Sequence, residues 1–216
     1  MKHLNKIFII LCLPLLMCAS AEAQHSGPYV GLLDGGSMLA PAKTSDALGD
    51  FKMSFKPNIV ASAVVGWDLE PGDPLGTGRV ELEYSRRSNT LDTVKFVEGS
   101  FAGGGTVKSE SLLLNFIGVY HDDTCVSPYA GFGAGAARIE ASNLLVTGHL
   151  LSSGSDDVFA YQLVAGVDFR LTDHFSLDLG YRFFGSARPA FTEAGGKKLT
   201  MDYRSHNAVL GLRVGF

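Results

Sequence analysis

The chain has 216 residues, of which 46% are hydrophobic and 10% aromatic, and its formal net charge is −4. A net negative charge argues against a nucleic-acid partner. The length suits one domain of moderate size.

Residues 1–23 have the pattern of a secretory signal peptide. Its parts are the basic residues Lys2 and Lys6, the apolar stretch 7–17 and the small-residue cleavage motif Ala21-Glu22-Ala23. We therefore expect export, followed by a mature domain at 24–216. The apolar stretch has about half of the ~20 residues that a membrane-spanning helix needs, so we expect any membrane crossing to be made by strands.

The cysteines add two expectations. Cys18 could mark a lipoprotein, but the bulky Met17 stands where a small residue would precede a lipidated cysteine. If the signal peptide is cleaved instead, Cys12 and Cys18 leave with it and the mature chain keeps Cys125 alone. We then expect neither an internal disulfide nor a metal site built on cysteine.

Eight stretches of alternating character predict β-strands separated by turn-rich segments. The predicted strands are 28–37, 58–69, 77–87, 110–121, 127–139, 158–170, 174–186 and 203–216. Long connections at 38–57, 88–109, 140–157 and 187–202 alternate with short ones at 70–74, 122–125 and 172–173. Extracellular loops that alternate with tight periplasmic turns are typical of outer-membrane barrels. The sequence thus predicts an all-β fold, an eight-stranded antiparallel transmembrane β-barrel with up-and-down topology.

The faces of these strands favour a barrel embedded in lipid over a soluble lipocalin-like barrel. Val80, Leu82 and Tyr84 share one face of strand 77–87, and charged residues occupy the other. In lipid, the apolar face turns outward and the polar face inward. Aromatic residues near the turn ends fit a belt at the membrane interface. This predicted belt comprises Tyr29, Trp67, Tyr120, Tyr129, Phe169, Phe175 and Phe216.

Strand parity assigns a balanced set of charged residues to the barrel interior. The set is Arg79, Glu81, Glu83, Asp168, Arg170, Asp178, Arg182 and Arg213. Because buried charges are costly unless paired, we expect an internal network of salt bridges, with Asn115 and Gln162 as further partners. An eight-stranded barrel encloses little more than its own side chains, so such a network would plug it. A gated, narrow ion path is the alternative.

Several segments resemble the eight-stranded outer-membrane families of the opacity, OmpA-transmembrane and OmpX type. They are 27–31, 126–135, 179–183 and 210–216. The resemblance covers the mature chain and implies a location in the outer membrane, in contact with its lipid. Phe216, an aromatic residue on an alternating last strand, resembles the signal that the outer-membrane assembly machinery reads. Since nothing follows Phe216, we expect no periplasmic peptidoglycan-binding domain.

The resemblance leaves the function open, and we expect it to lie in the four long connections. Adhesion to a host or envelope protein and a role in envelope integrity are the main candidates, and a narrow porin-like channel is the alternative. Apolar residues in the first and third connections indicate either strands that extend and pack beyond the membrane, or an exposed binding patch. These residues are Met38, Leu39, Phe51, Met53, Phe55, Leu144, Leu145, Val146, Leu150 and Leu151.

An enzyme that modifies lipid A is a less favoured alternative. His174 and Ser176 share one strand face, as a base and a nucleophile would. However, they lie beside the turn at 172–173, on the predicted periplasmic rim, and no acid is placed as a third member. We therefore expect no enzymatic activity, no cofactor and no metal site.

Overall fold

The computed structural model describes residues 26–46, 49–69, 77–120, 124–193 and 198–216. The expected signal peptide and parts of the turns at 70–74 and 122–125 lie outside these residues. No helix among the described residues is long and apolar enough to cross a lipid bilayer. The strands are β1 (Gly27–Leu39), β2 (Ala42–Asp46), β3 (Gly49–Lys56), β4 (Asn58–Asp68), β5 (Gly78–Lys95), β6 (Ser100–Val119), β7 (Val126–Val146), β8 (His149–Arg170), β9 (Phe175–Ser186), β10 (Ala190–Glu193), β11 (Lys198–Met201) and β12 (Arg204–Gly215).

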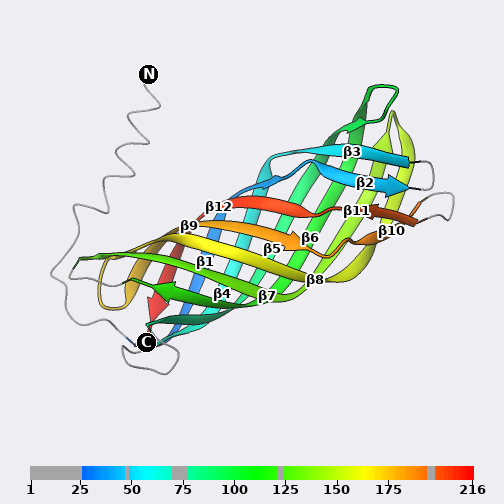
Figure 1. Ribbon diagram of the computed structural model, residues 1–216. Coiled ribbons are helices and arrows are strands. Elements are labelled where there is room, and N and C mark those ends of the chain that lie inside the picture. Colours follow the sequence, from blue (N-terminus) through cyan, green and yellow to red (C-terminus); the bar gives the residue numbers. More distant parts are fainter. Residues whose placement is uncertain (1–25, 47–48, 70–76, 121–123, 194–197) are drawn as a thin grey trace, which may run out of the picture.

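The strands close into one elongated barrel (Figure 1). At one end the ring runs β1, β4, β5, β6, β7, β8, β9 and β12, and every pairing is antiparallel. At the other end β2, β3, β10 and β11 take the places of β1, β4, β9 and β12. Pro41, Pro57 and Pro189 lie at three of these four handovers, where a residue without a backbone N–H interrupts the ladder. The predicted eight-stranded, up-and-down barrel is confirmed.

The pairing register fixes the stagger of the barrel. The paired residues lead from Asp157 on β8 through β7, β6, β5, β4, β1, β12 and β9 back to Val167 on β8, ten residues further along. A stagger of this kind tilts the strands against the barrel axis. With eight strands, the interior is just wide enough for side chains to fill.

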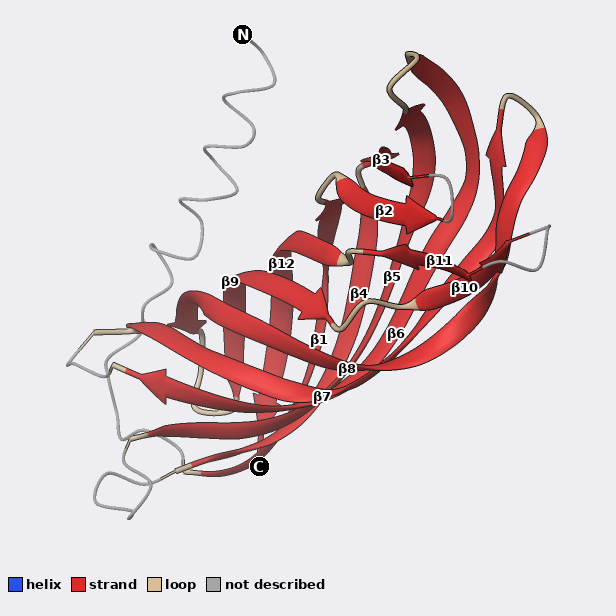
Figure 2. Ribbon diagram, turned by 45° about the vertical axis from the view of Figure 1, so that its right-hand side comes forward, coloured by secondary structure: helices blue, strands red, loops and turns tan. Residues whose placement is uncertain are grey.

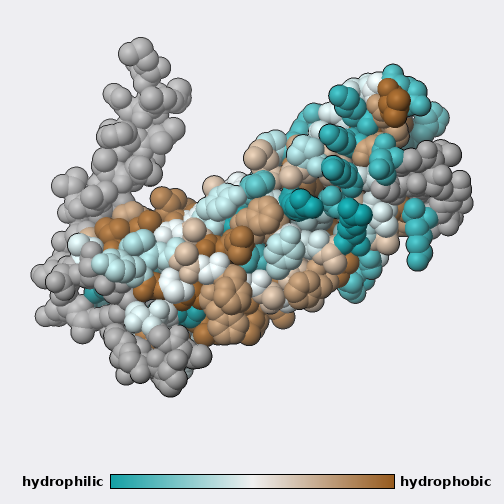
Figure 3. All heavy atoms as spheres, viewed as in Figure 1, coloured by the Kyte–Doolittle hydropathy of each residue, from teal (hydrophilic) through white to brown (hydrophobic). Residues whose placement is uncertain are grey.

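Two halves of opposite character make up the barrel (Figure 3). The half with the connections 69–77, 120–125 and 171–174, here called the membrane half, has an apolar outer wall and a polar interior. The other half, called the distal half, has a polar outer wall and an apolar interior. Along β5 the inward residues change from Arg79, Glu81 and Glu83 to Leu91 and Val94. The outer wall of the same strand changes in the opposite sense.

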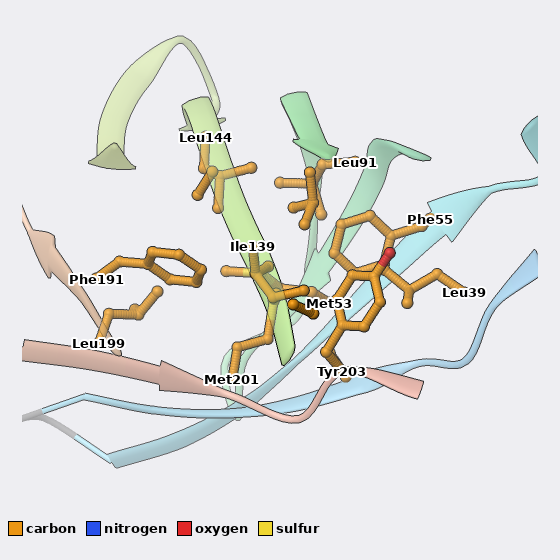
Figure 4. Close-up of a cluster of buried hydrophobic side chains, with 14 of the residues drawn as sticks. Leu39, Met53, Phe55, Leu91, Ile139, Leu144, Phe191, Leu199, Met201 and Tyr203 are labelled. Carbon is orange, nitrogen blue, oxygen red and sulfur yellow. The ribbon is translucent and has the colours of Figure 1, made fainter. Parts of the chain in front are cut away.

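An apolar plug fills the distal half (Figure 4). Side chains from many strands meet there, among them Met53, Leu91, Ile139, Phe184 and Tyr203, all with an exposed fraction of 0–1%. The Phe184 and Tyr203 rings meet edge to face with centroids 5.8 Å apart. The distal half is therefore packed like the core of a soluble barrel.

The predicted long loops are wrong in their extent, because most of their residues continue the strands. The connection at 140–157 narrows to Thr147 and Gly148, whose φ angles of 49° and 85° form a tight turn. Figure 2 shows the hairpins that extend the barrel at this end. Apolar residues such as Leu39, Phe51 and Leu144 face the plug, which supports the interpretation of extended strands. Met38 and Leu150 are exposed. The small residues of these segments fit into strands as well as into loops. Strands form here because they let the alternate apolar residues pack in the plug.

Cys125, in the connection between β6 and β7, is disulfide-bonded. The sequence predicted no internal disulfide. That prediction concerned the chain after cleavage of residues 1–23, which would remove Cys12 and Cys18.

Packing of the plug can be tested with Ile139→Ala. Because Ile139 is fully buried, its truncation should lower the free energy of unfolding by about 2–5 kcal/mol, measured by urea titration of the protein in lipid vesicles. The neighbouring Glu140 is exposed on the outer wall, and Glu140→Ala should change stability by less than about 0.5 kcal/mol. Equal effects at the two positions would contradict an inward-facing plug.

Candidate functional site

The polar interior of the membrane half begins with a cluster around Arg79. Its guanidinium donates to Asp168, lies 3.0 Å from Glu81 Oε1 and lies 3.6 Å from Asp178 Oδ2. Arg213 reaches the same Asp168 carboxylate at 3.0 Å. Four strands, β5, β8, β9 and β12, thus meet through one set of ion pairs in the barrel interior.

A second cluster surrounds Glu83 deeper in the barrel. Arg182 Nη1 lies 3.1 Å from Glu83 Oε2, which also accepts hydrogen bonds from Asn115 and Gln162 at 3.0 and 2.7 Å. Ser85 donates to the other carboxylate oxygen. Glu83 has no exposed surface, so these partners replace the water that a carboxylate would otherwise bind.

Arg87 joins the polar interior to the apolar plug. Its guanidinium donates to Ser111 Oγ at 2.9 Å and lies 4.1 Å from the centroid of the Phe184 ring. Phe184 belongs to the plug. A cation packed on an aromatic face is a favourable contact where charged and apolar layers must touch.

Tyr29 and Tyr129 lie inside the barrel, so their predicted place in the outer aromatic belt is wrong. Tyr29 Oη donates to Glu81 at 2.6 Å, and Tyr129 Oη donates to Asp178 at 2.7 Å. Arg213 and Arg79 lie over the two rings at 4.9 and 4.5 Å. A Cβ at Gly66 would meet the Tyr29 ring at 2.4 Å, so that glycine leaves room for an inward tyrosine.

Other members of the predicted belt do lie on the outer wall. Trp67, Tyr120, Phe175 and Phe216 are exposed by 44–66%, and Phe169 is half-buried. The strand pattern could not separate inward from outward tyrosines, because an amphipathic phenol suits both an interface and a hydrogen-bonded interior.

The structure places six of the eight predicted interior charges at no more than 4% exposure. Arg213 retains a little exposed surface, and Arg170 is half-buried beside the membrane-half mouth. Sequence reasoning missed Asp68, whose Oδ1 lies 3.9 Å from Arg213, and Arg87. Arg87 follows the parity of Glu83 and Ser85, so extending the alternation by one step would have found it.

His174 and Ser176 line a cavity of about 70 Å³ at the membrane-half mouth, together with Asp168, Asp173 and Arg213. His174 is exposed and Ser176 is half-buried. The residues of the less favoured enzyme hypothesis thus lie at the rim near the turn at 172–173, as the sequence predicted.

The outer wall of the membrane half is apolar on every strand of the ring. Its exposed residues include Leu32, Val65, Leu82, Leu114, Phe132, Leu163, Leu179 and Leu212. A closed barrel leaves no unpaired strand edge, and an apolar belt around a polar interior is the arrangement that lipid requires. The fold therefore defines a transmembrane β-barrel.

The chain belongs to the family of outer membrane protein β-barrel domains, whose model matches residues 8–216. It is similar to Neisserial surface protein A, with 19% identity, a TM-score of 0.54, and 88% of this chain and 99% of that chain covered. It is also similar to the outer membrane protein OprG from Pseudomonas aeruginosa, with 14% identity, a TM-score of 0.53, and 89% and 99% covered.

The outer membrane protease OmpT from Escherichia coli is a third similar structure, with 9% identity, a TM-score of 0.54, and 90% of this chain and 99% of that chain covered. A comparison with curated protein sequences gives no match. The family and these structures indicate the cell outer membrane as the location. Identities this low show a shared fold and leave the specific role open.

A double-mutant cycle tests the Glu83–Arg182 pair. Glu83→Ala and Arg182→Ala should each lower the free energy of unfolding by about 3–5 kcal/mol, because each leaves an uncompensated buried charge. The double variant should cost clearly less than the sum, measured by urea titration in lipid vesicles.

The matched control is the Arg86–Glu110 pair on the outer wall, 3.3 Å apart, whose side chains are 60% and 44% exposed. Its coupling energy should stay below about 1 kcal/mol. Additive losses at Glu83 and Arg182 would mean that the two charges do not depend on each other.

Proposed function

We propose that the protein is a closed, non-conducting outer-membrane scaffold that presents its distal half as an interaction surface outside the cell. The observation that carries this proposal is that side chains fill the interior of both halves. These two fillings are the charge network in the membrane half and the apolar plug in the distal half. A narrow channel is the alternative.

The two fillings oppose passage in different ways. A solute entering the membrane half would have to break buried ion pairs such as Glu83–Arg182, and each broken pair leaves a charge unpaired. A polar solute that passed them would then have to enter the plug and lose its hydration. The two barriers lie one after the other, so a polar solute would have to overcome both.

The two outer walls support the proposed orientation. Barrels of this class have short periplasmic turns and longer extracellular segments, and here the chain continues much further beyond the apolar belt in the distal half, through β2, β3, β10, β11 and the extended β5–β8, than at the opposite end. The polar outer wall of the distal half is suited to water, so this half projects from the bilayer. Export would be directed by residues 1–23 as a signal peptide.

Recordings from planar bilayers test the closed barrel. We expect no steady channel openings from the refolded protein, at either polarity and at 1 M salt. Insertion is checked on the same sample by resistance to protease and by the gel mobility of the unheated protein. Steady, reproducible openings would overturn the proposal and favour the narrow channel.

The double variant Glu83→Ala/Arg182→Ala sharpens this test. It removes a central pair of the charge network but leaves the plug intact, so it should also be silent. Openings in this variant alone would show that the charge network is the sole barrier.

We also propose that Phe216 is the residue that the outer-membrane assembly machinery contacts. Its ring is 65% exposed, and its backbone N–H donates to Pro28 O at 3.1 Å, beside the first strand. Phe216→Ala should reduce the amount of assembled barrel in cells at least threefold, measured by gel mobility of the unheated protein. Refolding of the same variant into vesicles from urea should proceed normally, and an equal defect in both assays would indicate a stability effect instead.

A further inference from the structure

Three lysines stand side by side on the outer wall of the distal half. Lys43 on β2 is paired directly with Lys52 on β3, and Lys52 is paired directly with Lys95 on β5. All three are exposed. Because neighbouring strands lie about 4.8 Å apart, this lysine row spans roughly 10 Å across three strands.

Like charges placed directly opposite each other destabilise a sheet. Elsewhere on the outer wall the chain pairs opposite charges, as in Arg86 with Glu110 and Arg138 with Asp157. No member of the lysine row has an ion pair among the residues that the structure describes. In a chain with more acidic than basic residues, three adjacent lysines without an ion pair, with Asp50 beside them in one groove, leave a surplus of positive charge that favours an anion from outside.

The lysine row lines a groove of about 680 Å³. Arg188 adds a fourth cation, held by a 2.7 Å contact with Asp202. Phe96 and Val97 line an apolar side of the groove, where Val97 is 95% exposed. The groove also contains Asp50, Phe51 and Thr200. It offers several positive charges beside an apolar surface, a combination suited to a ligand with anionic groups on a partly apolar frame.

The height of the groove narrows the choice of ligand. Lys52 lies seven residues beyond Ile59, an exposed apolar residue of the outer wall. Along a tilted strand this separation amounts to roughly 15–20 Å above the apolar belt. A lipid headgroup layer is only about 5–8 Å thick, so a simple lipid phosphate would not reach the row. Sugars attached to a lipid of the outer leaflet would.

We propose that this groove binds the phosphorylated sugar headgroup of a glycolipid in the outer leaflet around the barrel. Lysine ammonium groups bind phosphate as point charges. Because Asp202 pairs with Arg188 and Asp50 lies in the groove, the remaining surplus of about two positive charges matches one phosphomonoester. The apolar face of a sugar ring would cover Phe96 and Val97. This inference rests on the proposed orientation, since it places the distal half outside the cell.

The test uses the full protein in phosphatidylcholine vesicles and, as its probe, the phosphorylated core oligosaccharide released from rough lipopolysaccharide by mild acid. The key variant is Lys43→Gln/Lys52→Gln/Lys95→Gln. Its matched control, Lys56→Gln/Lys108→Gln/Lys198→Gln, removes the same charge from the distal half outside the groove. At 0.1 M salt the key variant should bind at least tenfold more weakly, and the control should stay within about twofold of the wild type. Binding of the wild type should weaken as salt is raised.

A stability measurement separates loss of binding from loss of folding. Lys52→Gln relieves repulsion on both sides of the row, so without ligand its unfolding midpoint should equal or exceed that of the wild type. With the probe present, the wild type should gain stability and the variant should gain less.

Three results would overturn the inference. They are equal affinity of the key variant and the wild type, equal binding of the oligosaccharide after removal of its phosphates, and tighter binding of a heparin fragment than of the phosphorylated core.

The bilayer recordings on the same preparation distinguish failure of this inference from failure of the proposed function. A conducting barrel that binds the probe would refute only the closed scaffold, and a silent barrel that ignores it would refute only the groove.

Discussion

The wall of this barrel is one strand thick, and alternate residues of every strand face the interior and the surroundings. In each half of this barrel, one face of the wall is apolar and the other is polar. In the membrane half, lipid requires an apolar exterior, and the interior then holds Glu83, Arg182 and their partners. In the distal half, the outer wall is polar and the interior becomes an apolar plug. Both faces of the same strands therefore change character at the boundary between the two halves.

The charge network and the plug follow from this constraint and depend on each other. Buried charges are costly unless paired, and the eight-stranded ring with its ten-residue stagger brings β5, β8, β9 and β12 close enough to pair them. Above them, Arg87 packs on Phe184 and closes the polar layer. The proposed role as a closed scaffold places the function on the outer surface. On that surface the lysine row departs from the pairing of opposite charges that prevails elsewhere.

Much of the fold could be predicted from local pattern. The alternation of Arg79, Glu81 and Glu83 with Val80, Leu82 and Tyr84 identified a strand in lipid and assigned its charges to the interior. The apolar residues around Phe51 and Leu144 allowed two interpretations, and the structure supports extended strands. The length of the connections was wrong, because glycine and serine runs such as 103–105 and 152–154 look like loops until a neighbouring strand pairs with them.

The sequence by itself determined that eight strands form the ring, their alternation and the side on which most charges lie, because a period of two is a property of neighbouring residues. Only the tertiary structure decided which charges pair, since Arg79 and Asp168 are far apart in the chain and meet through the register of the closed ring. It also turned Tyr29 and Tyr129 inward, where Glu81 and Asp178 accept hydrogen bonds from their hydroxyl groups. The lysine row was equally invisible in the sequence, because its three members come from different strands and become neighbours only when β2, β3 and β5 pair.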